Sequence, residues 1–269
     1  MALTTIGLMA LLGCFTGFMA GLLGIGGGMI ITPFLIMLIP SSLIPHEHIV
    51  HVAIATSLAT IAFTSLSSVR AHHKRGAVLW NVVASVAPGI LVGAVVGAQI
   101  AGWLPTFWLS LIFAAFVGFS AFKMFLNKSP RPDRNLPGTI GKFFMGIAIG
   151  ILSALVGAGG GFISVPWMIW CNVKMQNAVA TSAAFGFPIA LFGTIGYISS
   201  GWNVSGLPPW PIDLGYICIP ALFSVAITSV LFAPLGAKVA HSIDTKPLKK
   251  IFACLLLSLI HISEPTRRS

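Results

Sequence analysis

Two glycine-rich stretches carry the residues in this chain best suited to binding a small ligand through the backbone. Gly21–Pro33 reads GLLGIGGGMIITP, and Gly157–Pro166 reads GAGGGFISVP. Glycine inside a helix costs roughly 1 kcal/mol relative to alanine, and proline cannot donate a backbone hydrogen bond, so each stretch is expected to interrupt a helix. The N–H groups at the start of the second half-helix carry partial positive charge. They predict a small-anion site that needs no charged side chain, because glycine lets a ligand approach the backbone closely.

Hydroxyl groups follow each glycine stretch at a matching place, in the motifs Ala55-Thr56-Ser57 and Ala180-Thr181-Ser182. These side chains could add neutral donors to the same site. The alternative is that small residues only let membrane helices pack closely. His51 and Gln176 are polar residues just before these helices, and we assign them a gating role. The predicted substrate-binding residues are Gly24, Gly26, Gly27, Gly28, Thr56, Ser57, Gly157, Gly159, Gly160, Gly161, Thr181 and Ser182.

Other motifs are set aside. The cluster His46-Glu47-His48 does not make the zinc pattern HExxH, because position 50 is Val50. The glycine runs do not match GxGxxG, since Met29 and Phe162 fill the last place. We therefore expect no metal, no cofactor and no catalytic residue. An intramembrane enzyme stays open as a minor alternative, which would need a nucleophile and a base within reach of each other.

Composition indicates which elements must position these residues. The chain has 269 residues, of which 57% are hydrophobic and only 7% are charged, against about 25% charged in soluble domains. Windows such as Met1–His46 and Gly76–Phe122 lack Asp, Glu, Lys and Arg, and exceed the ~20 residues that span a bilayer. The class is an all-α polytopic membrane protein. The net charge of +10 lies mostly in short loops, as membrane topology requires, so no nucleic-acid partner is expected.

The chain repeats itself. Shifted by 133 positions, Gly13, Gly17, Gly24, Gly26, Gly27, Gly28 and Pro33 fall on Gly146, Gly150, Gly157, Gly159, Gly160, Gly161 and Pro166. The ATS motifs and later small residues match in the same order. Repeats with interrupted hydrophobic segments at matching positions are typical of secondary transporters. The predicted domains are a first transmembrane repeat at 1–126, a cytoplasmic linker at 127–141, a second repeat at 142–256, and a tail at 257–269.

The positive-inside rule gives the two halves opposite orientations. Arg70–Arg75, RAHHKR, is basic, whereas its counterpart Ser199–Pro211 has no basic residue; His241–Lys250 is basic, whereas its counterpart Trp103–Thr106 is not. Inverted halves need an odd number of crossings each. We expect ordinary spans near 49–69, 78–102, 105–126, 178–199, 212–237 and 248–262. The glycine-bearing segments are then re-entrant hairpins of two short half-helices; eight full crossings with kinked helices is the alternative.

The end of the chain differs from the rest. Leu257–Arg267, LSLIHISEPTR, resembles a translated sequencing adapter, so 257–269 is interpreted as a non-native tail and excluded from functional reasoning. The four cysteines lie in apolar segments and predict no disulfide.

With its glycine stretches, its ATS motifs and the segment GYICIPALFSVAITSVLFAPLGAKVAH, the chain resembles the TauE/SafE sulfite-exporter family. The resemblance implies a bacterial or archaeal inner-membrane permease of two homologous halves. It also implies sulfite, thiosulfate, sulfonates or related sulfur oxyanions as substrates, where the residues alone indicate a small anion.

The sequence thus predicts a secondary transporter for a small sulfur-containing anion, working by alternating access around two glycine-broken helices. A permease for another small anion or a neutral metabolite is the alternative within transport. The expected partners are the substrate and the lipid bilayer, and a homodimer is compatible with the sequence. Direction of transport and coupling ion are left open.

Overall fold

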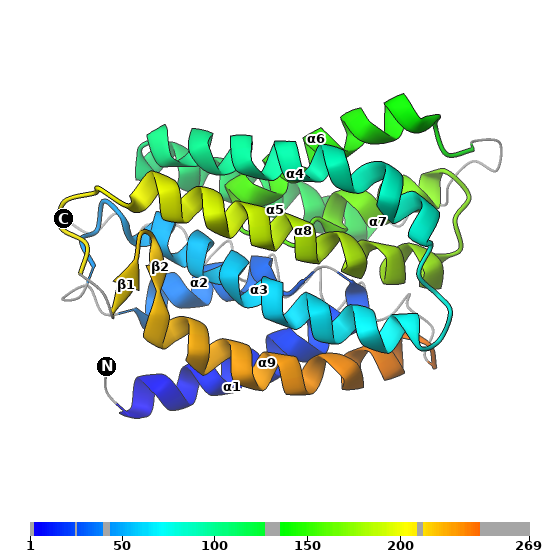
Figure 1. Ribbon diagram of the computed structural model, residues 1–269. Coiled ribbons are helices and arrows are strands. Elements are labelled where there is room, and N and C mark those ends of the chain that lie inside the picture. Colours follow the sequence, from blue (N-terminus) through cyan, green and yellow to red (C-terminus); the bar gives the residue numbers. More distant parts are fainter. Residues whose placement is uncertain (1–2, 25, 40–43, 127–134, 209–211, 243–269) are drawn as a thin grey trace.

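Helices account for almost the whole of the computed structural model, which describes residues 3–24, 26–39, 44–126, 135–208 and 212–242 (Figure 1). One short antiparallel ladder accompanies them, pairing Asp213 with Cys218 and Leu214 with Ile217. The elements are α1 (Leu3–Leu23), α2 (Gly28–Leu38), α3 (Ile49–His73), α4 (Trp80–Trp103), α5 (Thr106–Leu126), α6 (Thr139–Val156), α7 (Gly161–Trp170), α8 (Met175–Gly201), β1 (Asp213–Leu214), β2 (Ile217–Cys218) and α9 (Ile219–Ala240).

Six of these helices are long and apolar enough to cross a membrane: α1, α3, α4, α6, α8 and α9. Their outward faces are apolar as well. On α9, Phe223, Ile227, Leu231 and Leu235 recur every four residues and are each 50–65% exposed. A continuous apolar stripe of this kind would be costly in water, so it indicates a face that meets lipid.

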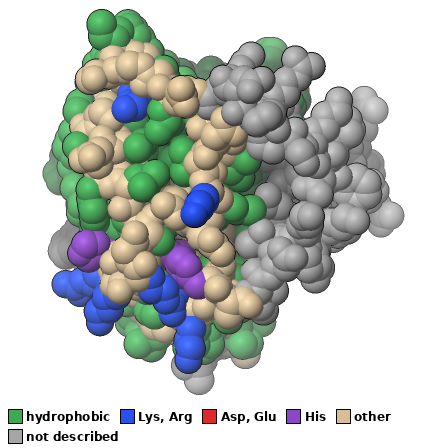
Figure 2. Space-filling model, turned by 90° about the vertical axis from the view of Figure 1, so that its right-hand side faces the viewer, with side chains coloured by type: hydrophobic (Ala, Val, Ile, Leu, Met, Phe, Trp, Pro, Cys, Tyr) green, Lys and Arg blue, Asp and Glu red, His purple; other side chains and the backbone are tan. Residues whose placement is uncertain are grey.

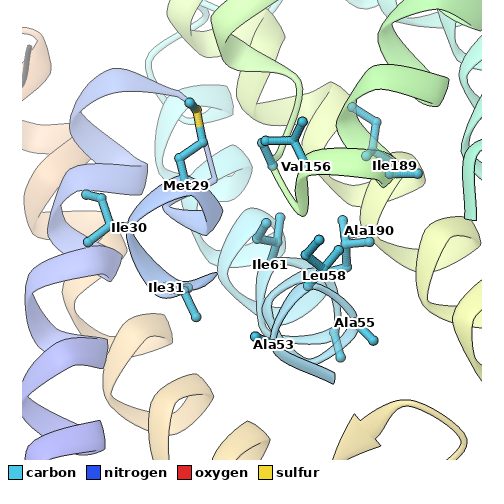
Figure 3. Packing of buried hydrophobic residues seen from close by; sticks show 14 of the residues in the cluster. Met29, Ile30, Ile31, Ala53, Ala55, Leu58, Ile61, Val156, Ile189 and Ala190 are labelled. Carbon is cyan, nitrogen blue, oxygen red and sulfur yellow. The ribbon is translucent and has the colours of Figure 1, made fainter. Parts of the chain in front are cut away.

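Two helices form the centre of the bundle. The buried share is 78% for the apolar window of α3 and 67% for that of α8, whereas it is 39% for α4, α6 and α9. Both central helices carry an ATS motif within their buried part, so the predicted hydroxyl donors lie inside the protein and not on its lipid-facing surface. Figure 3 shows Leu58 and Ile61 of α3 in the apolar cluster that also holds Val156, Ile189 and Ala190.

Glycines let the outer helices approach closely in two pairs. Gly13, Gly17 and Gly21, spaced four apart, bring α1 against the backbone of α9, where a Cβ at any of them would overlap a carbonyl oxygen. Gly89 and Gly93 do the same where α4 meets α6. Small residues at this spacing are the usual device for close packing of membrane helices.

The observed helices follow most of the expected spans, with two differences, and some expected segments are not described. The glycine stretches do separate helices, but unequally, because α1 has 21 residues and α6 has 18, whereas α2 has 11 and α7 has 10. The span expected at 212–237 begins later, at Ile219, because residues 213–218 form the hairpin β1–β2. The span expected at 248–262 and the tail at 257–269 lie outside the described residues, as does the 127–134 part of the linker.

Candidate substrate site at the two glycine segments

Each glycine segment turns the chain between two helices by the same backbone conformations. Gly24 has φ 66° and Gly157 has φ 67°, and both follow the end of a long helix. Gly27 (φ 74°, ψ −10°) and Gly160 (φ 76°, ψ −10°) each cap the short helix that follows. Residues with a side chain rarely adopt this left-handed backbone conformation, so glycine is needed at these four positions.

The two segments lie against each other. A Cβ on Gly26 would lie 3.0 Å from the Cα of Gly159, and a Cβ on Gly28 would overlap the carbonyl oxygen of Gly157. Residues more than 125 positions apart in the sequence therefore meet inside the bundle. Gly161 is buried as the first residue of α7. The predicted site glycines of both halves thus gather in one region, with the N-termini of two short helices, where the first N–H groups have no partner within the helix.

The serine hydroxyls of the ATS motifs hold the glycine segments in place. Ser57 Oγ lies 3.2 Å from the carbonyl oxygen of Gly28 and 3.1 Å from that of Gly157. Ser182 Oγ donates to the carbonyl oxygen of Gly24 at 2.8 Å. Ser164 of α7 lies 2.8 Å from Ser182 and completes this chain of hydroxyls. In this conformation the hydroxyls of both ATS serines donate hydrogen bonds to backbone carbonyl oxygens.

The threonines of the same motifs serve a different purpose. Thr56 Oγ1 accepts the backbone N–H of Cys218 at 3.0 Å, just ahead of α9. Thr181 Oγ1 accepts the backbone N–H of Leu79 at 3.0 Å, just ahead of α4. Each central helix thereby caps the start of a helix from the other half of the chain.

A narrow hollow adjoins the first glycine segment, with about 180 Å³ of empty space, open solvent included, but no room for a water molecule in this conformation. It is lined by Ala20, Gly26, Ser65, Ser68, Ala183 and Gly186. Both serines are 2% exposed. Ser65 Oγ bonds to its own helix at Ala62, whereas Ser68 Oγ has no hydrogen-bond partner. A buried hydroxyl without a partner costs free energy, so it marks a place where a polar ligand would be favourable.

Sequence reasoning missed these two serines. A usable signal was present, since Ser57, Ile61, Ser65 and Ser68 follow one another at spacings of four, four and three and therefore share one face of α3. What the sequence did not show is that this face meets α8 at Gly186, where a Cβ would lie 3.2 Å from Ser65 Cβ.

The two residues assigned a gating role lie at opposite ends of the bundle. His51 is in the first turn of α3, and its Nε2 is 3.0 Å from the carbonyl oxygens of both Ala101 and Leu104, where α4 ends. Its ring stacks on Tyr216 of the hairpin with centroids 5.1 Å apart. Gln176 is exposed in the first turn of α8 and lines a second hollow with His72 and His241. By helical rise, His51 and His72 are about 30 Å apart.

Charged groups are scarce around the glycine segments. None of the residues lining the adjoining hollow is ionisable. Asp213, in β1, is a buried acid: it is 4% exposed, and neither carboxyl oxygen has a hydrogen-bond partner. Burial raises its pKa to about 6, and the neighbouring Cys218 opposes this rise. Within the described residues, no group of three His, Cys, Asp or Glu side chains is arranged to hold a metal ion.

Comparison with known proteins indicates a membrane transporter. The sulfite exporter TauE/SafE family matches residues 9–261. A probable membrane transporter protein of Haemophilus influenzae is 34% identical over 255 residues, covering 94% of this chain and 96% of its own. Another from Bacillus subtilis is 30% identical, covering 69% and 76%, and one from Methanocaldococcus jannaschii is 27% identical, covering 93% and 91%. No solved structure matches the chain. The chain belongs to the TauE/SafE sulfite exporter family of membrane transporters and is a multi-pass protein of the cell membrane.

Proposed function

We propose that this protein is a secondary transporter for small sulfur-containing anions such as sulfite, thiosulfate or organosulfonates. The substrate binds where the two glycine segments meet, and alternating access occurs around them. The observation that carries the proposal is the approach of Gly26 to Gly159, which brings two helix N-termini together among neutral side chains. Helix N-termini attract anions, and a site without carboxylates does not favour cations. The name of the family supports the sulfur chemistry.

The proposal includes an inverted repeat, which three observations support. The left-handed glycines match in pairs, Gly24 with Gly157 and Gly27 with Gly160. The threonine caps are reciprocal, since Thr56 of the first half caps α9 and Thr181 of the second caps α4. The first helix of each half packs on a helix of the other half, α1 on α9 and α6 on α4. A pseudo-two-fold axis between the halves would produce all three relations.

Charge supports one orientation in the membrane. Figure 2 shows Lys and Arg side chains gathered with histidines on one end of the molecule. The six cations whose side chains the structure describes belong to helix ends on this side: Arg70, Lys74 and Arg75 at the end of α3, Lys142 and Lys174 at the starts of α6 and α8, and Lys238 at the end of α9. By the positive-inside rule this end faces the cytoplasm. Helices α2 and α7 are then re-entrant, each returning toward the face from which α1 or α6 began.

Ligand-dependent stability tests the proposal. Purified protein is melted with sulfite, thiosulfate, a small sulfonate, sulfate, phosphate or acetate, since a ligand of the folded state stabilises it by RT ln(1 + [L]/Kd). We expect a rise in Tm that is selective for the sulfur oxyanions sulfite or thiosulfate, or for the sulfonate. Ser68→Ala should weaken this rise, because it removes the unpartnered hydroxyl beside Gly26.

Ser85→Ala is the matched control, because the Ser85 hydroxyl donates only within its own helix, to Asn81 and Val82. Counterflow of the stabilising anion in proteoliposomes then separates binding from transport. Equal stabilisation by every anion, or by none, would contradict the proposed substrate class, and binding without counterflow would contradict transport.

A further inference from the structure

A second hollow lies at the basic end of the bundle. It encloses about 210 Å³, open solvent included, with little room beyond a single water molecule, and is lined by Leu22, His72, Met175, Gln176, Val179, Ala240 and His241. The residues that line the two hollows fall on shared helix faces. Ser65, Ser68 and His72 lie along one face of α3, and Gly186, Ala183 and Val179 lie along one face of α8. We call the seam between these two faces, from Gly26 toward the end of the molecule that carries the cations, the groove; it is closed in this conformation, since neither hollow has room for more than about one water molecule.

Two histidines close this groove at its outer end. His72 is fully buried, and its Nε2 lies 2.9 Å from the carbonyl oxygen of Gly21 in α1. Its Nδ1 lies 3.2 Å from Nε2 of His241, the residue that caps α9. Arg75 strengthens the same junction by donating from Nη1 to the carbonyl oxygen of Ala237 at 2.6 Å. The pair therefore ties α1, α3 and α9 together beside the groove.

The hydrogen-bond partners fix where the protons are. A carbonyl oxygen only accepts, so His72 Nε2 must carry its proton and donate it to Gly21. In the neutral His72 ring, Nδ1 then carries no proton and accepts a hydrogen bond from the Nε2–H of His241. One further proton fits on the pair without breaking these bonds. A second would place two N–H groups opposite each other at 3.2 Å, which the closed arrangement cannot accommodate.

The charges around the pair also disfavour added protons in the closed state. Arg75 faces both rings, and burial together with Arg75 lowers the pKa of His241. The lining residues of α1 and α8, namely Leu22, Met175, Gln176 and Val179, do not ionise, and α9 adds Lys238 in its last turn. The surroundings of the pair are thus neutral or positive among the described residues, so added protons repel one another and Arg75 in the closed state.

We propose that the groove between α3 and α8 is the cytoplasmic half of the substrate path, and that the His72–His241 pair is its gate, opened by protonation. This inference rests on the proposed transport function. Opening would separate His241 from His72 and expose the imidazolium groups to an arriving anion. Since protons favour the open state, acid on the cytoplasmic side should open the path.

Cysteine accessibility tests the gate without any substrate. In a background with the native cysteines replaced, Ala183→Cys places a thiol in the deeper hollow, where Ala183 is 4% exposed. Inside-out membrane vesicles are treated with an impermeant maleimide at about pH 8 and about pH 5.5, which brackets histidine titration. Labelling is normalised to Gln176→Cys, an exposed reporter at the mouth, because thiol reactivity itself varies with pH. We expect the normalised labelling to rise at least about fivefold at acid pH, since one linked proton shifts an equilibrium up to tenfold per pH unit.

Variants separate a gate from a structural contact. His241→Ala removes the partner of His72 and should give high labelling at both pH values. His241→Gln keeps an amide that can donate to or accept from His72 but does not titrate, so it should label weakly at both. The matched control is His73→Gln, because His73 is exposed and accepts from Trp80 Nε1 at 3.1 Å, away from the pair; it should behave as the wild type.

Labelling of Ala183→Cys that does not change with pH, or that changes equally in His241→Gln, would overturn the gate. Each of these results is independent of which substrate is carried. If the anion panel gives no stabilisation while labelling still responds to acid, the proposed substrate is wrong and the gate stands.

Discussion

The Ser57 hydroxyl oxygen lies 3.1 Å from the carbonyl oxygen of Gly157, although the two residues are 100 positions apart in the chain. The same oxygen is 3.2 Å from the carbonyl of Gly28. A single side chain of α3 thus joins the glycine segments of both halves. On the proposed mechanism, a movement of α3 relative to these segments must exchange one of these bonds for another, which makes Ser57 a place where substrate and backbone compete for one proton.

Ser57→Ala should therefore destabilise the protein and impair transport together. Two buried carbonyl oxygens would lose their donor, at about 1–3 kcal/mol for an unsatisfied buried group. The measurement is the melting temperature in detergent, followed by counterflow in proteoliposomes at a temperature where the variant stays folded. Ser85→Ala should change neither quantity. Unchanged stability of Ser57→Ala would mean that this hydroxyl does not hold the segments together.

The hydrogen bonds that Thr56 and Thr181 accept should contribute equally to the unfolding free energy. Thr56→Val and Thr181→Val each keep the side-chain shape but remove the acceptor for a backbone N–H, that of Cys218 or Leu79. Each variant should lose about 1–3 kcal/mol of unfolding free energy. Thr→Ser at either site should retain most of it, because the hydroxyl stays. A large loss at one site and none at the other, measured by chemical unfolding in micelles, would argue against a symmetric role in the two halves.

Local chemistry decides the parts of the fold that the sequence predicts well. Glycine runs cannot continue a helix comfortably, so the breaks after Leu23 and Val156 follow from the residue types alone. Apolar length predicts the central helices α3 and α8 to within a few residues, although their ends differ by up to four. The ATS motifs lie on buried helix faces, whereas their role in substrate binding stays a prediction.

Features that depend on packing between distant segments are not predictable in this way. Helix α1 continues to Leu23, longer than a half-helix, while Gly13, Gly17 and Gly21 fit against α9 along its length. The hairpin ahead of α9 turns at Gly215, whose φ of 60° interrupts an otherwise apolar run. The pairing of His72 with His241 joins residues 169 positions apart, and nothing in either local sequence indicates the other.

Close contact between the glycine segments predicts a strong position-dependent effect of one methyl group. In Gly28→Ala the new Cβ would overlap the carbonyl oxygen of Gly157 and lie 2.5 Å from Ile61 Cδ1, so the two segments must separate. We expect a loss of several kcal/mol, above the roughly 1–3 kcal/mol typical of overpacking, and little folded protein in the membrane. Gly7→Ala is the control, because nothing lies within 4 Å of its Cβ, and helix propensity should make it neutral or stabilising. Fluorescence-detected size-exclusion chromatography compares the two, and similar yields of folded protein would rule out a tight contact at Gly28.

Asp213 predicts a pH dependence of stability with a definite sign. Its pKa is raised from 3.8 to about 6 because the carboxyl group is buried in β1, so the folded state holds the proton more tightly than the unfolded chain. The unfolding free energy should be highest below pH 4, where both states are protonated, and should fall as pH rises to about 6.

The variant Asp213→Asn tests this, because its side chain stays neutral at every pH. It should raise the stability by about 3 kcal/mol at neutral pH, from a shift of about two pKa units at 1.36 kcal/mol each, and by well under ~1 kcal/mol near pH 4. Melting curves at the two pH values measure this, with Glu47→Gln as the control, since Glu47 is 75% exposed. A gain of the same size at both pH values would show that packing and not ionisation explains the effect, and a loss at neutral pH would mean that the carboxylate is functionally charged and held by a cation or donor in the membrane.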